Sequence, residues 1–366
     1  MIGPADEYPI HQVPQPIAWP ATSDRNFYDR SYHSVMNQSG DFMLATGMGY
    51  YSNLGTKDAF VVFRRGDHQI GLNLGDAIDH DRLRPRVGPY RVEVIEPLTQ
   101  VRLLLAETEG IAFDLTWHSS FPVVQELPHV MRRGARPTLD SQRFTQMGTY
   151  SGWIRIDGQT LTLDSEQWLG FRDRSWGIRP VGEAEPPGAP IPFDGMWMCF
   201  AGLRFDEFAV ALLAQEDPDG FRVHNDCVTV DTNGAISQWG WPAITIDYLE
   251  GTRYPSHARI ETALRDGAPV HLDLDLLTGI AGHLGGGYGG AGDWGHGMWR
   301  GEGFIQRVEY DLADAAVAPR VTFGSIDHTA RVACTIGDAE PVQGWGLFSH
   351  AILGRHTPSG FHDWFP

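Results

Sequence analysis

Apolar and polar residues alternate along many short stretches of this chain. The clearest is Tyr90 to Glu96, which reads YRVEVIE, and similar stretches run from Val101 to Glu107 and from Ile111 to Trp117. A period of two with many β-branched residues is typical of strands that bury one face. We therefore predict strands at these positions, each with one face in a core.

Short turn signals separate the alternating stretches. Asp157-Gly158 lies between WIRI and QTLTL, and Asp266-Gly267 lies between IETALR and APVHLDLDL. Asp-Gly tolerates the positive φ of a tight turn, so both pairs predict hairpins. Long helical periodicity is nearly absent, which argues against a parallel α/β sheet. Many antiparallel strands at short spacing predict a mainly β fold of barrels or sandwiches.

The length of 366 residues suggests two domains, because one ordinary domain has roughly 150 residues. The clearest internal boundary is segment 183–192, EAEPPGAPIP, whose prolines cannot donate to a sheet ladder. We expect an N-terminal β domain over residues 1–182, a Pro-rich linker over 183–194 and a C-terminal β domain over 195–366.

Charge and composition narrow the range of partners. The chain has 46 acidic residues against 28 Lys and Arg, for a net charge of −18. Such a surface repels phosphate backbones and anionic membranes, so we expect no nucleic-acid partner. No stretch approaches the length of an apolar transmembrane helix, so we also expect no membrane insertion. Whether the protein forms a homo-oligomer stays open.

The N-terminal segment and the cysteines give an expectation about location. The first residues lack the basic start and apolar run of a secretory signal. Cys199, Cys227 and Cys334 are scattered, odd in number and form no C-x-x-C pair. We expect buried, reduced thiols in a cytoplasmic protein.

The segment most informative about chemistry is Trp168 to Pro180, WLGFRDRSWGIRP. On a strand, alternation would give it two unlike faces. One face holds Phe171, Asp173 and Ser175, and the other holds Arg172, Arg174 and Trp176. Asp173 must then bury its charge or point it into a cavity, and a buried carboxylate needs an arginine or another donor nearby. A structural arginine–carboxylate clamp is the alternative to a catalytic role.

The stretch Asp173 to Gly177, DRSWG, resembles the D-H-E-W-G signature of the AttH-like and carotenoid 1,2-hydratase-like superfamily. It is most similar to an uncharacterised bacterial branch that reads RDRSWG-x-RP. Similarity to this branch continues over most of the chain, at FYDR (27–30), YYSNLG (50–55), GPYRVE (88–93), FDLTW (113–117) and GSIDHTAR (324–331). Similarity to the characterised hydratases rests on the short motif and the two-part layout.

The resemblance implies two lipocalin-like antiparallel β-barrel domains packed side by side. It also implies chemistry without a redox cofactor on apolar, isoprenoid-like or polyketide-like substrates. Where the hydratases carry His and Glu, this chain has Arg174 and Ser175, so a mechanism that needs either group does not carry over. We expect Asp173 and Arg174 to be catalytic, with Asp173 as the acid or as the residue that orients it. Arg172, Arg174 and Arg179 would bind an oxygen-bearing end of the substrate, and Trp176 would line the pocket.

A second unusual segment is Gly279 to Phe304, which is dense in glycine. It is either a flexible loop or a flap over a pocket, with Tyr288, Trp294 and Trp299 as substrate contacts. It formally contains G-x-G-x-x-G, but no βαβ unit surrounds it. We therefore expect no nucleotide cofactor.

Other titratable residues give weaker signals. His350, His356 and His362 recur every six residues, a spacing that puts no two on one helix face, and we expect no metal site. Asp114 and Glu126 are further candidates for an acid. Burial in its apolar strand would raise the pKa of Asp114, and the alternative is that this side chain points to solvent.

Two hypotheses about function follow. The first is a cofactor-independent lyase or isomerase that hydrates, dehydrates or rearranges an unsaturated apolar molecule, such as a terpenoid, steroid or aromatic metabolite. The second is a non-catalytic lipocalin-like protein that binds a hydrophobic ligand. Convergent carboxylate, arginine and histidine groups in the pocket would favour the enzyme, and a wholly apolar lining would favour the carrier.

Overall fold

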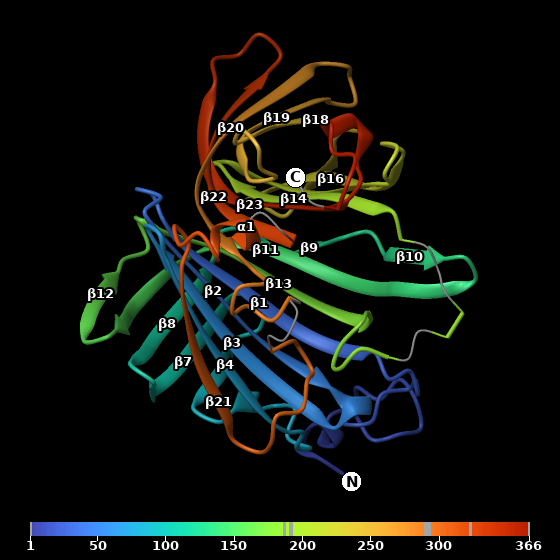
Figure 1. The fold of residues 1–366 in the computed structure, drawn as a ribbon, viewed down its shortest axis with the longest axis vertical. Coiled ribbons are helices and arrows are strands. Elements are labelled where there is room, and N and C mark those ends of the chain that lie inside the picture. The colour runs from blue at the N-terminus through green and yellow to red at the C-terminus, as the bar shows by residue number, and fades with distance from the viewer. Residues whose placement is uncertain (1, 186–187, 190–192, 289–293, 322–323, 365–366) are drawn as a thin grey trace.

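Two antiparallel β-sheets make up the protein, seen in a computed structural model that describes residues 2–185, 188–189, 193–288, 294–321 and 324–364 (Figure 1). Sheet 1 consists of β1 (Phe27–Asn37), β2 (Phe42–Tyr51), β3 (Thr56–Arg65), β4 (His68–Ala77), β5 (Arg86–Val87), β6 (Tyr90–Glu96), β7 (Gln100–Thr108), β8 (Ile111–Ser119), β9 (Val124–Gln125), β10 (His129–Arg133), β11 (Arg136–Ile156), β12 (Gln159–Leu163), β13 (Trp168–Ile178) and β21 (Phe304–Asp311). Sheet 2 consists of β14 (Gly195–Arg204), β15 (Phe208–Glu216), β16 (Arg222–Asp231), β17 (Ile236–Gln238), β18 (Ala243–Tyr248), β19 (Pro255–Ala263), β20 (Pro269–Ala281), β22 (Gly324–Ile336) and β23 (Val342–Gly354).

Helix is scarce in the described residues. It comprises α1 (Ala318–Val321) and the 3₁₀ turns η1 (Pro4–Glu7), η2 (Ser52–Leu54) and η3 (Thr357–Ser359). No helix among these residues is long and apolar enough to cross a membrane. The predicted mainly β, antiparallel fold is confirmed.

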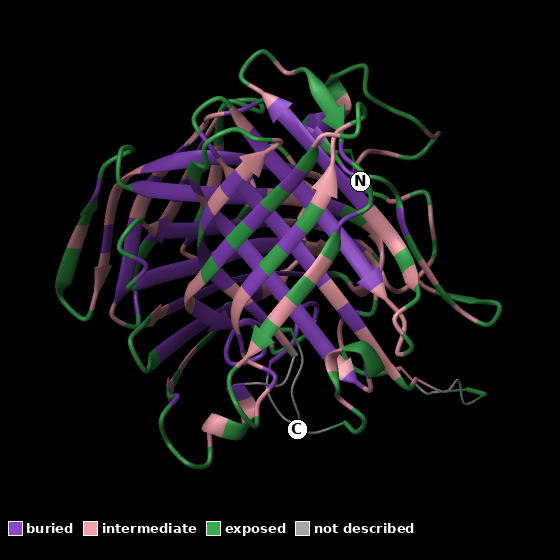
Figure 2. Cartoon of the chain, turned by 90° about the horizontal axis from the view of Figure 1, so that it is seen from above, coloured by how far each residue is buried: buried purple, intermediate pink, exposed green. Residues whose placement is uncertain are grey.

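The predicted hairpins are present. Asp157 and Gly158 connect β11 to β12 with φ values of 47° and 80°, as a tight turn with two positive φ angles requires. Gly267, with φ of 91°, lies in the connection between β19 and β20. The alternation seen in the sequence appears as buried and exposed bands along several strands (Figure 2). Strand β7 shows it clearly, since Val101, Leu103 and Leu105 are buried and their neighbours are not.

The apolar residues form three main cores. One lies inside the curl of sheet 1, where Val61 and Leu72 from one part of the sheet belong to the same cluster as Leu103 and Leu115 from another. A second fills the curl of sheet 2. The third lies between the sheets and includes residues from both, such as Phe171 and Phe200, whose ring centroids are 5.1 Å apart. This third layer contains the candidate site.

The chain crosses once from the second half back to the first sheet. Strand β21 pairs with β4 along its whole length, from Phe304 opposite Gly75 to Asp311 opposite His68, and Figure 1 shows it beside β4. The segment before β21 also packs on sheet 1, since the Gln69 side chain hydrogen-bonds the carbonyls of Ala281 and Leu284. The boundaries at residues 182 and 195 stay a prediction, and the linker between them lies partly outside the described residues.

Candidate functional site

A cavity of about 470 Å³ lies between the two sheets. Its size falls within the range of about 300–1,000 Å³ that is usual for small-molecule sites. One part of its lining is apolar, with Met131, Met196, Met198, Leu213 and Leu353. The other part gathers charged and hydroxyl side chains from both sheets. The cavity therefore suits a ligand with an apolar body and a polar end.

Alternation along two neighbouring strands creates the polar wall on sheet 1. Strand β13 directs Phe171, Asp173 and Ser175 into the cavity, which is the face predicted from the sequence. The adjacent strand β1 contributes Tyr28, Arg30 and Tyr32, again at every second position.

The register of the strands decides which of these side chains meet. Ser175 lies opposite Arg30 on β1 and opposite Arg143 on β11, so its small side chain leaves room for two guanidinium groups. Asp173 lies opposite Tyr32 and is therefore diagonal to both arginines, an offset of about 7–8 Å between Cα atoms. The site thus places a carboxylate among cations.

Nearby arginines act on the Asp173 carboxylate through their charge, without a direct ion pair. Among the residues that the structure describes, no arginine, lysine or histidine nitrogen lies within 4.0 Å of the Asp173 carboxylate. The close contact with an arginine that we expected is therefore not made. Burial raises the pKa of the Asp173 carboxyl, while Arg143, Arg30 and Arg179 act in the opposite direction. The accessible surface of this side chain faces the cavity, where a ligand would meet it.

Sheet 2 contributes a second carboxylate. Asp327 on β22 accepts a hydrogen bond from the Tyr32 hydroxyl at 2.7 Å, a contact that joins the two sheets. Ser349, its partner across the β22–β23 pair, also hydrogen-bonds it. Burial raises the pKa of Asp327, and the hydrogen bonds from the Tyr32 and Ser349 hydroxyl groups lower it by a smaller amount. Asp327 and Asp173 thus differ in surroundings, since only Asp173 is stabilised in its ionised form by cations.

Arg30 is fixed by a chain of buried groups. It is 5% exposed, and its Nη2 donates to the Tyr288 hydroxyl at 3.2 Å and lies 2.9 Å from Nε2 of His296. Burial lowers the pKa of His296 to about 4, so its ring is neutral at pH 7 and can accept from Arg30. Nδ1 of His296 lies 3.6 Å from Asp58. Asp58 in turn accepts from the Gly297 amide at 2.6 Å.

Arg143 is held in a different way. Its Nε donates to Glu126 at 2.6 Å, and Glu126 is 5% exposed. Burial raises the pKa of Glu126 to about 7 although Arg143 opposes this. Glu126 Oε1 has no hydrogen-bond partner among the described residues. Glu126, one of the two further acids considered from the sequence, thus lies directly behind the cavity lining, because it binds the lining residue Arg143.

Asp114, the other such acid, lies elsewhere. It forms a bidentate pair with Arg102 at 2.7 and 2.6 Å. Arg102 lowers the pKa of Asp114 through this pair, which opposes a role as a proton donor.

The structure brings only some of the expected site residues together. Asp173 and Arg179 line the cavity. Arg174 and Trp176 lie on the opposite face of β13 because side chains alternate along a strand. Arg174 contacts Asp29 there, and Trp176 is 40% exposed. Neither lines the cavity.

Arg172 points into the core of sheet 1. It donates to Gln146 Oε1 at 3.2 and 2.8 Å and lies 4.2 Å from the centroid of the Trp117 ring. Burial lowers its pKa to about 10, so it stays charged at neutral pH. Its contacts are those of a structural cation stacked on an aromatic ring.

The glycine-rich segment contributes to the cavity one of the three aromatic residues that were expected as contacts. Tyr288 lines the cavity, whereas Trp294 is buried between the sheets against His296 and Trp299 is 45% exposed. Residues 289–293 lie outside the described part, so the flap interpretation stays a prediction.

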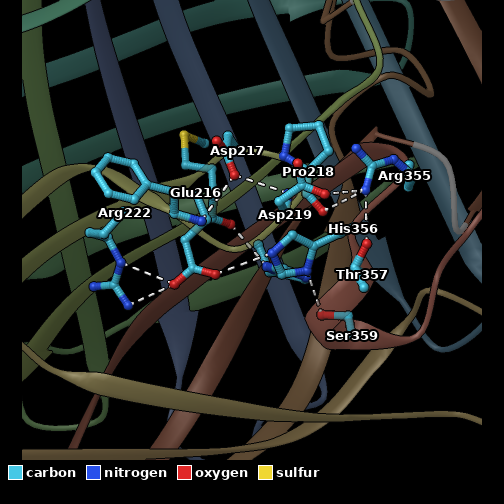
Figure 3. Close-up of polar contacts among 12 residues, drawn as sticks. Glu216, Asp217, Pro218, Asp219, Arg222, Arg355, His356, Thr357 and Ser359 are labelled. Atoms are coloured by element: carbon cyan, nitrogen blue, oxygen red, sulfur yellow. Dashed lines mark hydrogen bonds and ion pairs between the residues drawn. The ribbon is translucent and has the colours of Figure 1, made fainter.

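His356, one of the three C-terminal histidines, belongs to a separate polar cluster beside sheet 2 (Figure 3). His356 lies 2.9 Å from the Ser359 hydroxyl and 3.1 Å from Glu216, which Arg222 also binds. This order of groups resembles a Ser–His–Glu triad, but the amides of Gly360 and Phe361 beside the serine donate to backbone carbonyls. No N–H at these positions is left for an oxyanion.

The same cluster does not gather metal ligands. His350 contacts Tyr248 instead, at 2.9 Å. Throughout the described ranges, no three His, Cys, Asp or Glu side chains are arranged to hold a metal ion.

Three important lining residues were missed from the sequence: Arg30, Arg143 and Asp327. Arg30 and Asp327 occur within the FYDR and GSIDHTAR stretches that carry the resemblance. That coincidence was the one available signal for them.

Comparison with known proteins places the chain among related folds. The model of a family described as "Family of unknown function (DUF8625)" matches residues 2–362. No curated protein matches the sequence. Kievitone hydratase from Nectria haematococca has a similar structure, with a TM-score of 0.54, 13% identity and 89% of each chain covered.

Two more solved structures are similar. A putative AttH from Nitrosomonas europaea has a TM-score of 0.53 at 13% identity, with 89% of this chain and 92% of that chain covered. CghA with Sch210972 has a TM-score of 0.51 at 12% identity, with 90% of this chain and 89% of that chain covered. The resemblance to AttH-like and hydratase proteins is thereby confirmed at the level of the fold.

Proposed function

The chain belongs to this family of unknown function, DUF8625, and we propose that it is a cofactor-independent isomerase or hydro-lyase for an unsaturated, mostly apolar small molecule. The observation that carries the proposal is the pair of carboxylates, Asp173 and Asp327, one from each sheet, in one cavity. Two titratable groups whose surroundings differ are the usual basis for separate acid and base roles.

The surroundings of the two carboxyl groups assign their roles. We assign the base to Asp173, because three arginines oppose the burial that raises its pKa, whereas no arginine does so for Asp327. Asp327 is the acid, because burial raises the pKa of its carboxyl and the groups that oppose this are the hydroxyls of Tyr32 and Ser349. Tyr32 lies opposite Asp173 on the neighbouring strand and donates to Asp327, so it lies next to both carboxylate-bearing residues.

The reaction class follows from these roles. Asp173 removes a proton from carbon, and Asp327 delivers one either to another carbon or to a departing hydroxyl group. The first outcome moves a double bond, and the second releases water. The apolar walls limit access of water to the reacting atoms.

The lining favours an enzyme over the alternative, a carrier. A carrier for an apolar ligand gains nothing from burying carboxylates and arginines, which are costly to desolvate. The similar folds of kievitone hydratase and CghA add support by analogy of fold.

The base can be tested without knowing the natural substrate. Nitrobenzisoxazole is a small apolar ring that a desolvated base opens: the base takes the C–H proton, the N–O bond breaks, and a coloured cyanonitrophenolate forms. We expect the wild-type protein to accelerate this opening. Asp173→Asn should lower the rate by at least about a hundredfold while the protein stays folded.

Asp114→Asn is the matched control, because Asp114 is an aspartate on sheet 1 that faces away from the cavity and pairs with Arg102. It should leave the ring-opening rate unchanged. If Asp173→Asn keeps the wild-type rate, or if the two variants lose activity equally, Asp173 is not the base.

A further inference from the structure

We propose that the substrate is a neutral carbonyl compound with an acidic hydrogen next to the carbonyl carbon, and that Arg30 binds the carbonyl oxygen as it gains negative charge. This inference rests on the proposed function, because it takes Asp173 as the base. It adds the substrate class and a catalytic role for Arg30.

The hydrogen-bond partners of Arg30 leave it available to an oxygen. Both partners, the Tyr288 hydroxyl and His296, are neutral. No carboxylate lies within 4.0 Å of its guanidinium group in the described part of the chain. A guanidinium group carries five N–H donors, and Nη2 is the atom that makes both contacts. The cavity therefore meets a fixed cation with unused donors.

The neighbouring groups hold Arg30 without neutralising it directly. Asp58 balances its charge from behind His296, on the side away from the cavity. Asp58 is itself anchored by the Gly297 amide and the Tyr51 hydroxyl. His296 and Asp58 are thus positioning residues, and the arrangement is that of a preorganised donor aimed at a developing charge.

The charge balance of the site favours a neutral ligand. Three cations and four carboxyl groups lie at or directly behind its polar lining. They are Arg30, Arg143, Arg179, Asp58, Glu126, Asp173 and Asp327. Cationic and carboxyl groups are thus similar in number at this site. A ligand carboxylate would add an uncompensated charge beside Asp173, whereas a ketone adds none.

Proton removal then shifts a charge within the site without creating a new one. Asp173 takes the proton from the carbon, the C–H electron pair forms a C=C bond, and the carbonyl π electrons move to oxygen. The carboxylate becomes neutral as the enolate oxygen becomes negative. Arg30 lies diagonal to Asp173 across β1 and β13, so it can face the oxygen while Asp173 faces the carbon.

The test uses para-nitrophenol as a stable mimic of the enolate, because its phenol and phenolate forms absorb differently. Asp173→Asn represents the protonated base. We expect this variant to bind the phenolate at least about tenfold more tightly than the wild-type protein does. The double variant Asp173→Asn/Arg30→Gln should lose this tighter binding of the phenolate. Arg155→Gln, a half-exposed arginine of β11 that pairs with Glu107, is the matched control and should leave it intact.

Each outcome decides the inference. Phenolate binding that is equal in wild type and Asp173→Asn, absent in both, or unchanged by Arg30→Gln would overturn the role of Arg30. The ring-opening result would stand in any of these cases, because it reports only the base. If the Arg30→Gln chain does not fold, Tyr288→Phe replaces it and should weaken phenolate binding about threefold, through loss of one hydrogen bond that orients the guanidinium group.

Discussion

Replacing Glu126 with glutamine should stabilise the protein at alkaline pH. The ordinary pKa of 4.5 is raised by burial to about 7 in Glu126, so the folded state holds this proton more tightly than the unfolded state. The resulting stabilisation is fully present below pH 4.5 and is lost as the pH rises through about 7. A pKa difference of about 2.5, at about 1.36 kcal/mol for each pKa unit, amounts to about 3 kcal/mol.

Glutamine has the shape of the protonated side chain and can still accept from Arg143. We therefore expect Glu126→Gln to match the wild-type free energy of unfolding near pH 4.5 and to exceed it by about 3 kcal/mol at pH 8. Urea unfolding of both proteins across this pH range measures the difference. Glu107→Gln is the control, since the Glu107 side chain is 54% exposed and its surface pair should matter by less than about 1 kcal/mol.

The reasoning would be refuted by a stability difference that does not change with pH. It would equally be refuted if Glu126→Gln lost stability as the pH rises. Either result would mean that the contact with Arg143 outweighs the desolvation of Glu126, and that this carboxylate is ionised in the folded protein throughout the range.

Two further predictions test the packing and the orientation of β13. In Gly170→Ala the new Cβ would lie 2.3 Å from the Tyr150 ring, so urea unfolding should show a loss of about 1–3 kcal/mol. In Gly75→Ala the nearest atom to the new Cβ is 3.5 Å away, so this control should lose less stability. A loss of unfolding free energy as large as that of Gly170→Ala would contradict the packing argument. Arg174→Gln should keep the ring-opening rate within about twofold and stability within about 1 kcal/mol, because Arg174 lies outside the cavity in a half-exposed pair. A large loss of activity would put Arg174 back in the site.

Local features of the fold could be predicted from the sequence because they depend on neighbours along the chain. Asp157-Gly158 specifies its own turn, and alternation along β13 correctly separated Asp173 from Arg174. Which of the two faces meets a cavity depends on the partner sheet. From the sequence, the face with Arg172 and Arg174 was as suitable for binding a substrate as the face with Asp173. In the structure, Arg174 points outward to Asp29 and Arg172 points into the core of sheet 1.

The site itself depends on pairings between distant parts of the sequence. Arg30 and Arg143 both become neighbours of Ser175 only through the register of β1 and β11 with β13. Asp327 reaches the same cavity from the other sheet. No local pattern encodes such a register, which is set by the hydrophobic faces of whole strands.

The position of the cavity between two sheets keeps the proposed acid, Asp327, apart from the proposed base, Asp173. Each carboxylate belongs to a sheet with its own core, and Tyr32 is the side chain seen to hydrogen-bond across to Asp327. Charged groups within one core would be driven to pair, because an isolated buried charge is costly. Asp173 and Arg30 instead face a space that a ligand can fill, and Arg30 is also held by Tyr288 and His296 of the segment that crosses back to sheet 1. The fold therefore keeps a base and a cation close to each other but not neutralised by direct contact, which is the condition that proton transfer from carbon requires.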